Sequence, residues 1–177
     1  MKQRAVLTPQ ITACKRKDID MNGFICPVCG KSLEIKEKSY VCENRHSFDI
    51  SSKGYVNLLL SGQMNAKLPG DNKMMVNART EFLSKGYYSH LAQAVCDAVC
   101  VHFHGGVLLD AGCGEGWYDR CIAQQFAKAG RPLQLAGFDI AKPAVRLAAK
   151  ALPAARYAVA SSFSQPVRTG WADLLLN

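Results

Sequence analysis

The stretch VLLDAGCGEGWY, residues 107–118, decides the fold of this 177-residue chain. Its first three residues form a short apolar run that is typical of a buried parallel strand. The glycines that follow allow a tight turn and let bare backbone approach a ligand closely. We expect a helix to begin near Glu115, and the free N–H groups at a helix start attract a carboxylate or phosphate. The stretch therefore predicts a strand, a ligand-binding loop and a helix in succession.

The spacing of the glycines discriminates between two kinds of cofactor. A dinucleotide-binding loop carries the pattern G-x-G-x-x-G. Here Gly112, Gly114 and Gly116 alternate with other residues, and Trp117 stands where the third dinucleotide glycine would be. The pattern therefore argues against a nicotinamide cofactor. A glycine-rich turn in some other α/β protein remains the alternative interpretation.

Two acidic residues complete the pattern around the loop. Asp110 directly precedes it, and Asp139 ends the next apolar run, LQLAGFD. At that position the Asp139 carboxylate can accept hydrogen bonds from both hydroxyls of a ribose. The order D-x-G-x-G-x-G, a helix and a strand ending in Asp resembles that of the class I S-adenosylmethionine-dependent methyltransferases. This resemblance implies that the loop, Asp110 and Asp139 hold S-adenosylmethionine.

The chain beyond the loop alternates between helical and strand patterns. We expect a helix to residue 129, a strand over 133–139, a helix from Pro143 to about 152, and strands over 156–160 and 172–176. This β-α-β-α-β order predicts an α/β fold with a parallel, doubly wound, Rossmann-like sheet. Ser161 follows the third strand, where the resemblance implies that the adenine rests.

The composition is that of an ordinary soluble globular chain. Apolar residues make up 49% and charged residues 20%, and no run reaches the roughly 18 apolar residues that span a bilayer. Residues 1–25 are basic and polar, without the apolar region of a signal peptide. We therefore expect a cytoplasmic protein with no membrane partner.

A second motif lies near the start of the chain. The spacing C-x2-C-x12-C-x3-H is formed by Cys26, Cys29, Cys42 and His46. Two short ligand pairs separated by about a dozen residues are typical of tetrahedral zinc sites. Four protein ligands leave no open coordination position, so the pattern predicts a structural zinc ion. The alternative is four unrelated buried residues.

The motifs divide the chain into four parts. Residues 1–22 read as a flexible basic leader, and Met21 is a candidate translation start. Residues 23–60 form a zinc-binding lobe with strands at 39–42 and 47–50, which is too small to fold on an apolar core alone. Residues 61–104 are a helical linker, and residues 105–177 belong to the cofactor-binding domain.

Two helices are expected in the linker. Asp71 caps the first, which ends at Gly86 and presents an apolar stripe to the core. The stripe residues recur at helical spacing and comprise Met75, Ala78, Arg79 and Phe82. The second helix runs from Ser89, its cap, to about Phe103 and presents Leu91, Val95 and Val99. Cys96 and Cys100 on it are expected to pack in the core rather than bind metal.

The connecting segments extend the resemblance to a particular family. They are GYVNLL (54–59), PGD (69–71), M-x-x-A-R (75–79), FL (82–83) and GYY (86–88). With the zinc and cofactor motifs, they closely resemble the bacterial 23S ribosomal RNA guanine-N1-methyltransferases over residues 24–177. In that family the zinc ligands fall on Cys26, Cys29, Cys42 and His46. The methyl donor is contacted at the positions of Tyr88, Gly114 and Glu115, where an aromatic ring would attract the sulfonium cation.

The resemblance implies transfer of a methyl group to guanine N1 in a hairpin loop of 23S ribosomal RNA. The zinc lobe would grip the loop, and a net charge of +8 suits a polyanionic partner, although five positive charges lie in the leader. A homodimer is one candidate assembly. A non-catalytic RNA-binding fragment and a small-molecule methyltransferase are the rival functions.

The family continues through further strands that carry its substrate pocket, so the sheet expected here is incomplete. We therefore expect this chain to bind zinc but to transfer methyl groups poorly or not at all alone. We also expect an exposed apolar sheet edge that favours aggregation.

Overall fold

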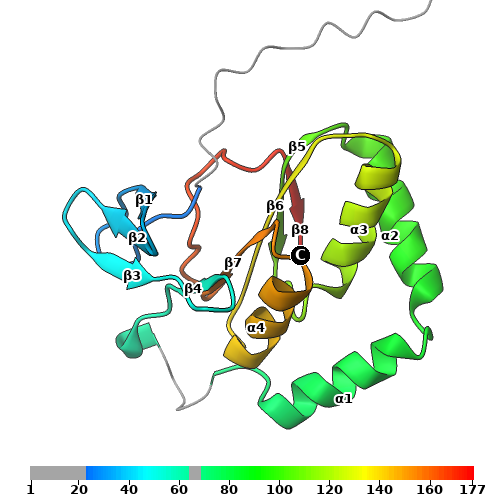
Figure 1. The fold of residues 1–177 in the computed structure, drawn as a ribbon, viewed down its shortest axis with the longest axis horizontal. Helices are drawn as coiled ribbons and strands as arrows, with labels where there is room; N and C mark the ends of the chain where they lie inside the picture. The colour runs from blue at the N-terminus through cyan, green and yellow to red at the C-terminus, as the bar shows by residue number, and fades with distance from the viewer. Residues whose placement is uncertain (1–22, 64–68) are drawn as a thin grey trace, which may run out of the picture.

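The computed structural model describes residues 23–63 and 69–177 of the chain (Figure 1). The leader predicted over residues 1–22 and the candidate start at Met21 lie outside the described residues. Within them, no helix has the length and apolar character needed to cross a bilayer.

A small antiparallel sheet forms the core of the N-terminal lobe. Its strands pair in the order β1-β2-β3 and comprise β1 (Leu33–Lys36), β2 (Ser39–Cys42) and β3 (Ser47–Asp49). The tight turn between the first two contains Glu37 with a positive φ of 54°. The strands predicted over 39–42 and 47–50 are confirmed, whereas β1 was not predicted.

A parallel sheet of five strands forms the centre of the molecule, in the order β4-β7-β6-β5-β8. Its members are β4 (Tyr55–Asn57), β5 (Gly106–Ala111), β6 (Leu133–Asp139), β7 (Arg156–Val159) and β8 (Leu174–Leu176). The predicted β-α-β-α-β order is confirmed. β4 lies within the range assigned to the zinc lobe from sequence, yet it pairs with β7 in this larger sheet.

Helices cover one face of the parallel sheet. The helices are α1 (Lys73–Ser84), α2 (Ser89–His102), α3 (Trp117–Lys128) and α4 (Lys142–Ala151), and a short 3-10 helix spans Ser61–Gln63. Alternate strand residues such as Leu108, Leu135 and Tyr157 pack against buried side chains of α2, α3 and α4. Because successive strand residues point to opposite faces, the other half of each strand needs a different cover.

The zinc lobe covers the opposite face, where a doubly wound fold would have helices (Figure 1). Val107, Leu109 and Phe138 of the sheet share one apolar cluster with Phe24 of the lobe and Trp171 of the C-terminal segment. No helical residue belongs to this cluster within the described ranges. The predicted parallel, Rossmann-like sheet is confirmed, and its strand order reverses at β5 as in doubly wound folds. In the described residues, however, the zinc lobe and the C-terminal segment cover the second face in place of helices.

The first linker helix differs from its prediction in cap and face. Its N-cap is Asn72, not Asp71, and the Asn72 side chain accepts hydrogen bonds from two backbone N–H groups of the first turn. Val76 is its buried residue, whereas Met75 and Phe82 are 53% and 45% exposed. The helix packs through Val76 against Ala141 and Ala144 at the start of α4, so the predicted stripe lies outside the core.

The second linker helix is confirmed in extent but not in its cap. Ser89 is the first helical residue and provides no capping hydrogen bond. Val99 is buried as predicted, whereas Leu91 is 47% exposed. Cys96 is buried and Cys100 packs beside it in the core, which confirms their expected role.

Candidate functional site

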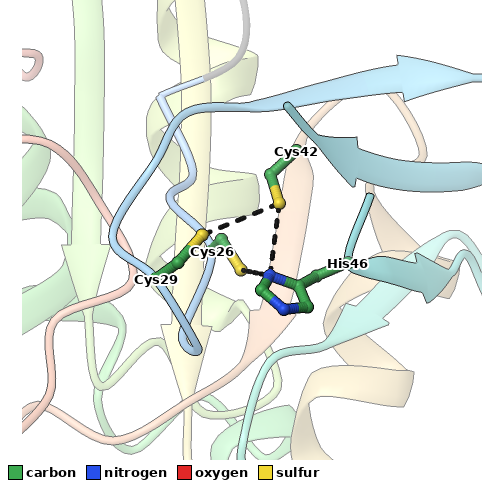
Figure 2. Close-up of side chains that lie close together, drawn as sticks. All are labelled: Cys26, Cys29, Cys42 and His46. Carbon is green, nitrogen blue, oxygen red and sulfur yellow. Dashed lines mark hydrogen bonds between the residues drawn. The ribbon is translucent and has the colours of Figure 1, made fainter. Parts of the chain in front are cut away.

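The predicted zinc ligands converge at one end of the small sheet (Figure 2). The donor atoms of Cys26, Cys29, Cys42 and His46 all lie within 4.8 Å of one another. His46 Nδ1 is 3.5 Å from Cys26 Sγ and 3.4 Å from Cys42 Sγ, and Cys29 Sγ is 3.7 Å from Cys42 Sγ. No other cluster of this kind occurs among the described residues.

Two tight backbone turns position these side chains. After the first cysteine pair, Gly30 has a φ of +71° and its N–H donates to the Cys26 carbonyl. After the third cysteine, Arg45 has a φ of +62° and its N–H donates to the Cys42 carbonyl. Left-handed residues turn the chain sharply enough to bring both ends of each ligand pair to one point. The sequence therefore builds the cluster locally, from two knuckles.

The thiols differ in their electrostatic surroundings. The backbone N–H of Lys31 lowers the pKa of the Cys29 thiol to about 6. Burial raises the pKa of the Cys26 thiol, although backbone N–H groups of Val28 and Cys29 act in the opposite direction. N–H groups directed at the sulfurs favour the thiolate form, which is the form that binds metals.

The donor set fits a zinc ion. In a tetrahedral site with ordinary zinc–ligand bond lengths, two sulfurs lie about 3.8 Å apart and a sulfur and a nitrogen about 3.6 Å apart. The separations of 3.4 to 3.7 Å observed here match those edges. Three cysteines and one histidine complete the coordination shell, so the metal would have a structural role.

A second candidate site is a cavity of about 560 Å³ beside the carboxyl end of β5. Ligands of parallel α/β sheets bind at this edge. The lining residues come from the linker helices, the glycine loop, α3 and the last residues of the chain. They are Arg79, Phe82, Leu83, Tyr88, Val95, Asp110, Gly112, Cys113, Gly114, Glu115, Trp117, Tyr118, Leu176 and Asn177.

Five of the eight residues predicted to bind the methyl donor line this cavity. They are Tyr88, Asp110, Gly112, Gly114 and Glu115. The other three, Gly116, Asp139 and Ser161, are not part of the lining. Contact with a cofactor stays a prediction for all eight residues.

The glycines of the loop serve two different purposes. Gly112 has a φ of +96°, and a Cβ added there would meet nothing within 4 Å, which leaves its backbone open to a ligand. Gly116 caps α3 with a φ of +69°, and its added Cβ would lie only 3.0 Å from Ala148 Cβ and 3.1 Å from Tyr157 Oη. Gly112 therefore forms part of the cradle, whereas Gly116 allows α3 to pack closely on α4 and β7.

Asp139 orders the loop from the neighbouring strand. Its Oδ2 accepts a hydrogen bond of 3.0 Å from the Gly114 N–H, and its Oδ1 accepts one of 2.7 Å from the Ala141 N–H. Ser161 is buried, and its Oγ accepts a 3.2 Å hydrogen bond from the Phe163 N–H. Each carboxylate oxygen has further lone pairs, so Asp139 can order the loop and still accept from a ligand.

Three buried carboxyl groups surround the loop. Asp110 and Glu115 line the cavity, and Glu115 Oε1 has no hydrogen-bond partner in the described part of the chain. Asp119, which the sequence did not single out, is fully buried in the first turn of α3 and accepts a 2.8 Å hydrogen bond from Tyr157 Oη. Burial raises the pKa of Asp110, and burial followed by the Asp110 charge raises the pKa of Asp119 well above its usual range. A protonated Asp119 can donate a hydrogen bond to Asp110.

An aromatic group stands on the linker side of the cavity. The Phe82 ring centroid lies 5.5 Å from that of Tyr88 and 5.1 Å from that of Tyr87. Tyr88 lines the cavity and is 43% exposed, so part of its side chain is accessible to a ligand. Phe82 was predicted to be a core residue, and its position beside the cavity is the reason that it is exposed instead.

The chain is similar to one known protein family and to several curated proteins. Residues 24–65 match the family model described as the N-terminal zinc ribbon of RlmA. The chain is 35% identical over 156 residues to the 23S rRNA (guanine(748)-N(1))-methyltransferase of Streptomyces fradiae. It is 28% identical over 169 residues to a Bacillus subtilis protein assigned as a 23S rRNA (guanine-N(1)-)-methyltransferase. These matches cover 86% and 92% of this chain but 53% and 58% of the relatives, so the chain spans about half their length.

One solved structure is similar in fold. It is a Methanococcus maripaludis protein assigned to the S-adenosyl-L-methionine-dependent methyltransferases, with a TM-score of 0.52 and 18% sequence identity. The similarity covers 63% of this chain and 52% of that protein. At 18% identity this similarity shows only that the two proteins share the α/β fold of S-adenosylmethionine-dependent methyltransferases.

Proposed function

The chain belongs to the RlmA-type family of 23S rRNA guanine-N1 methyltransferases, and from this membership we propose that it binds S-adenosylmethionine and serves methyl transfer to guanine N1 in a hairpin loop of 23S rRNA. The observation that carries the proposal is the cavity at the end of β5, lined by Gly112, Gly114 and Asp110. Its volume of about 560 Å³ lies within the range of small-molecule sites.

The lining suits a ligand with a positively charged sulfur. When bound, S-adenosylmethionine supplies an electrophilic methyl group on a sulfonium. Asp110 and Glu115 bring carboxyl groups to the cavity wall, and the exposed face of Tyr88 attracts a cation by about 0.5–2 kcal/mol. The open backbone at Gly112 and Gly114 allows close approach of the ligand, and Asp139 holds that backbone in place. In this proposal the residues bind and orient the donor, and positioning supplies much of the rate enhancement.

The proposed RNA partner rests on the family rather than on charge. The zinc lobe over residues 23–60 has five basic and four acidic residues. Its cations are exposed, and two of them, Lys31 and Lys36, pair with Glu43 and Glu34. The cations are Lys31, Lys36, Lys38, Arg45 and Lys53. A guanine in a hairpin loop is already partly unstacked, so extruding it costs only a few kcal/mol.

A single-turnover methyl-transfer assay tests the proposal. Zinc-loaded chain in excess over an unmodified 23S rRNA hairpin is incubated with methyl-tritiated S-adenosylmethionine, so that slow transfer is still detected. We expect label to enter the RNA slowly, because the chain spans about half the length of its relatives, and we expect no label when the target guanine is already N1-methylated. RNA retained on a filter without label would indicate a non-catalytic RNA-binding protein and contradict the proposal. Transfer to small molecules but not to RNA would indicate a small-molecule methyltransferase.

A further inference from the structure

One cation reaches the cavity from outside the glycine loop. Arg79 on α1 lines the cavity, and its Nη1 lies 3.9 Å from the position that a Cβ on Gly114 would occupy. The guanidinium therefore sits over the loop proposed to hold the methyl donor. Among the residues that line the cavity, Arg79 is the only lysine or arginine.

The guanidinium is held in this position by a neighbouring carboxylate. Arg79 Nη2 forms a 2.6 Å ion pair with Asp71 Oδ2. Asp71 is anchored because the next residue, Asn72, caps the helix through hydrogen bonds to the Met74 and Met75 N–H groups. A guanidinium has five N–H donors in a planar fork, so Asp71 engages one edge and leaves others for a ligand.

The charges around the cavity form a pattern that matches the amino-acid end of S-adenosylmethionine. That end carries an ammonium and a carboxylate. Asp110 and the buried, unpartnered Glu115 Oε1 suit the ammonium, and neither suits the carboxylate. Arg79 is the cationic side chain of the lining, and its guanidinium matches a carboxylate in geometry and charge.

We propose that Arg79, oriented by Asp71, binds the carboxylate of the methionine part of S-adenosylmethionine and thereby makes the cavity specific for the amino-acid-bearing cofactor. This inference rests on the proposed function, since it assigns a ligand group to a residue of the same cavity. It gives the linker helix α1 a role in cofactor binding, in addition to its packing on α4.

The test compares ligands that differ in the carboxylate alone. The Arg79→Met variant keeps the apolar stem and removes the charge. Calorimetric titrations on zinc-loaded protein use S-adenosylmethionine and its decarboxylated analogue, which retains the sulfonium and the ammonium. We expect R79M to weaken S-adenosylmethionine about 10- to 100-fold, as loss of a charge-assisted hydrogen bond does, and to leave binding of the analogue unchanged. R79K should retain part of the affinity.

The Arg146→Met variant on the exposed face of α4 is the matched control and should bind both ligands like the unaltered chain. Equal weakening of both ligands by R79M would show that Arg79 acts on the fold, and unchanged S-adenosylmethionine binding with weakened RNA binding would assign it to an RNA phosphate. Either result overturns the role proposed for Arg79, but the proposal that the unaltered chain binds S-adenosylmethionine still stands. If the unaltered chain binds neither ligand, the proposed function itself fails.

Discussion

The zinc cluster and the cavity differ in how far along the chain their residues lie. The metal donors fall within residues 26–46 and are positioned by two local turns. The cavity gathers side chains from residue 79 to residue 177, and no single element contains it. The first site can form wherever its short segment folds, whereas the second exists only when α1, α2, β5 and β8 are assembled. The two sites should therefore respond differently to mutation.

The two sites are nevertheless connected through the parallel sheet. Cys26 and Cys42 belong to the apolar cluster that includes Val107 and Leu109 of β5. The same strand ends at Asp110 and the glycine loop. The metal lobe thus covers one face of the strand whose end forms the cavity, and disruption of the lobe should reach the cavity.

The largest effect should follow removal of the metal. Structural zinc contributes roughly 10–16 kcal/mol in small domains, so Cys42→Ser or a chelator should unfold the lobe and expose the apolar face of the sheet. Circular dichroism melts and metal analysis would show loss of both the zinc and the cooperative transition. Cys100→Ser, in the helical core, is the control that should keep one zinc per chain. A metal-free chain with an unchanged melt would show that the lobe does not depend on the cluster.

The next largest effect concerns the glycine that packs α3 onto its neighbours. Gly116→Ala places a side chain on a left-handed backbone, and its Cβ would lie only 3.0 and 3.1 Å from neighbouring atoms. We therefore expect urea unfolding to show a free energy of unfolding that is lower by about 2–5 kcal/mol. Gly130→Ala has a similar φ of +62° with nothing within 4 Å of the added Cβ, and should cost only about 1–2 kcal/mol. Equal losses for the two variants would contradict the packing role of Gly116.

A smaller effect, dependent on pH, is expected at Asp119. Its folded-state pKa is raised, so the folded state holds a proton that the unfolded chain loses above about pH 4. The free energy of unfolding of the unaltered chain should therefore fall, relative to that of Asp119→Asn, as the pH rises from about 4 to the raised pKa. The fall is at most about 1.4 kcal/mol per pH unit. Asn keeps an acceptor for Tyr157 and a donor for Asp110 without a charge. Urea unfolding at pH 5 and pH 8 measures the difference, and Asp97→Asn on the exposed face of α2 is the control.

The smallest effect should come from the surface of the lobe. Lys31 and Glu43 form a 2.8 Å ion pair, but both side chains are more than half exposed. Such pairs contribute about 0–1 kcal/mol, so Lys31→Ala should leave the melt of the zinc-loaded chain almost unchanged. A loss comparable to that of Cys42→Ser would mean that surface charge, rather than the cluster, holds the lobe.

Features that depend on local spacing could be predicted from the sequence. The strand over 133–139 and the zinc ligand set follow from patterns within a few residues of each other. The cover of the second sheet face could not be predicted, because Phe24 and Trp171 meet there from opposite ends of the described chain. Phe82 and Arg79 were interpreted as part of a core stripe because helical spacing does not reveal which face of α1 packs on α4. The position of α1 over the loop, and with it the role proposed for Arg79, depends on tertiary contacts alone.

Equilibrium dialysis of the zinc-loaded chain with radiolabelled S-adenosylmethionine tests most directly whether the glycine-lined cavity binds the methyl donor. We predict one site per chain, from which S-adenosylhomocysteine displaces the label and nicotinamide dinucleotides do not. Absence of saturable binding by a chain that contains its zinc and melts cooperatively would contradict the assignment of the glycine-lined cavity.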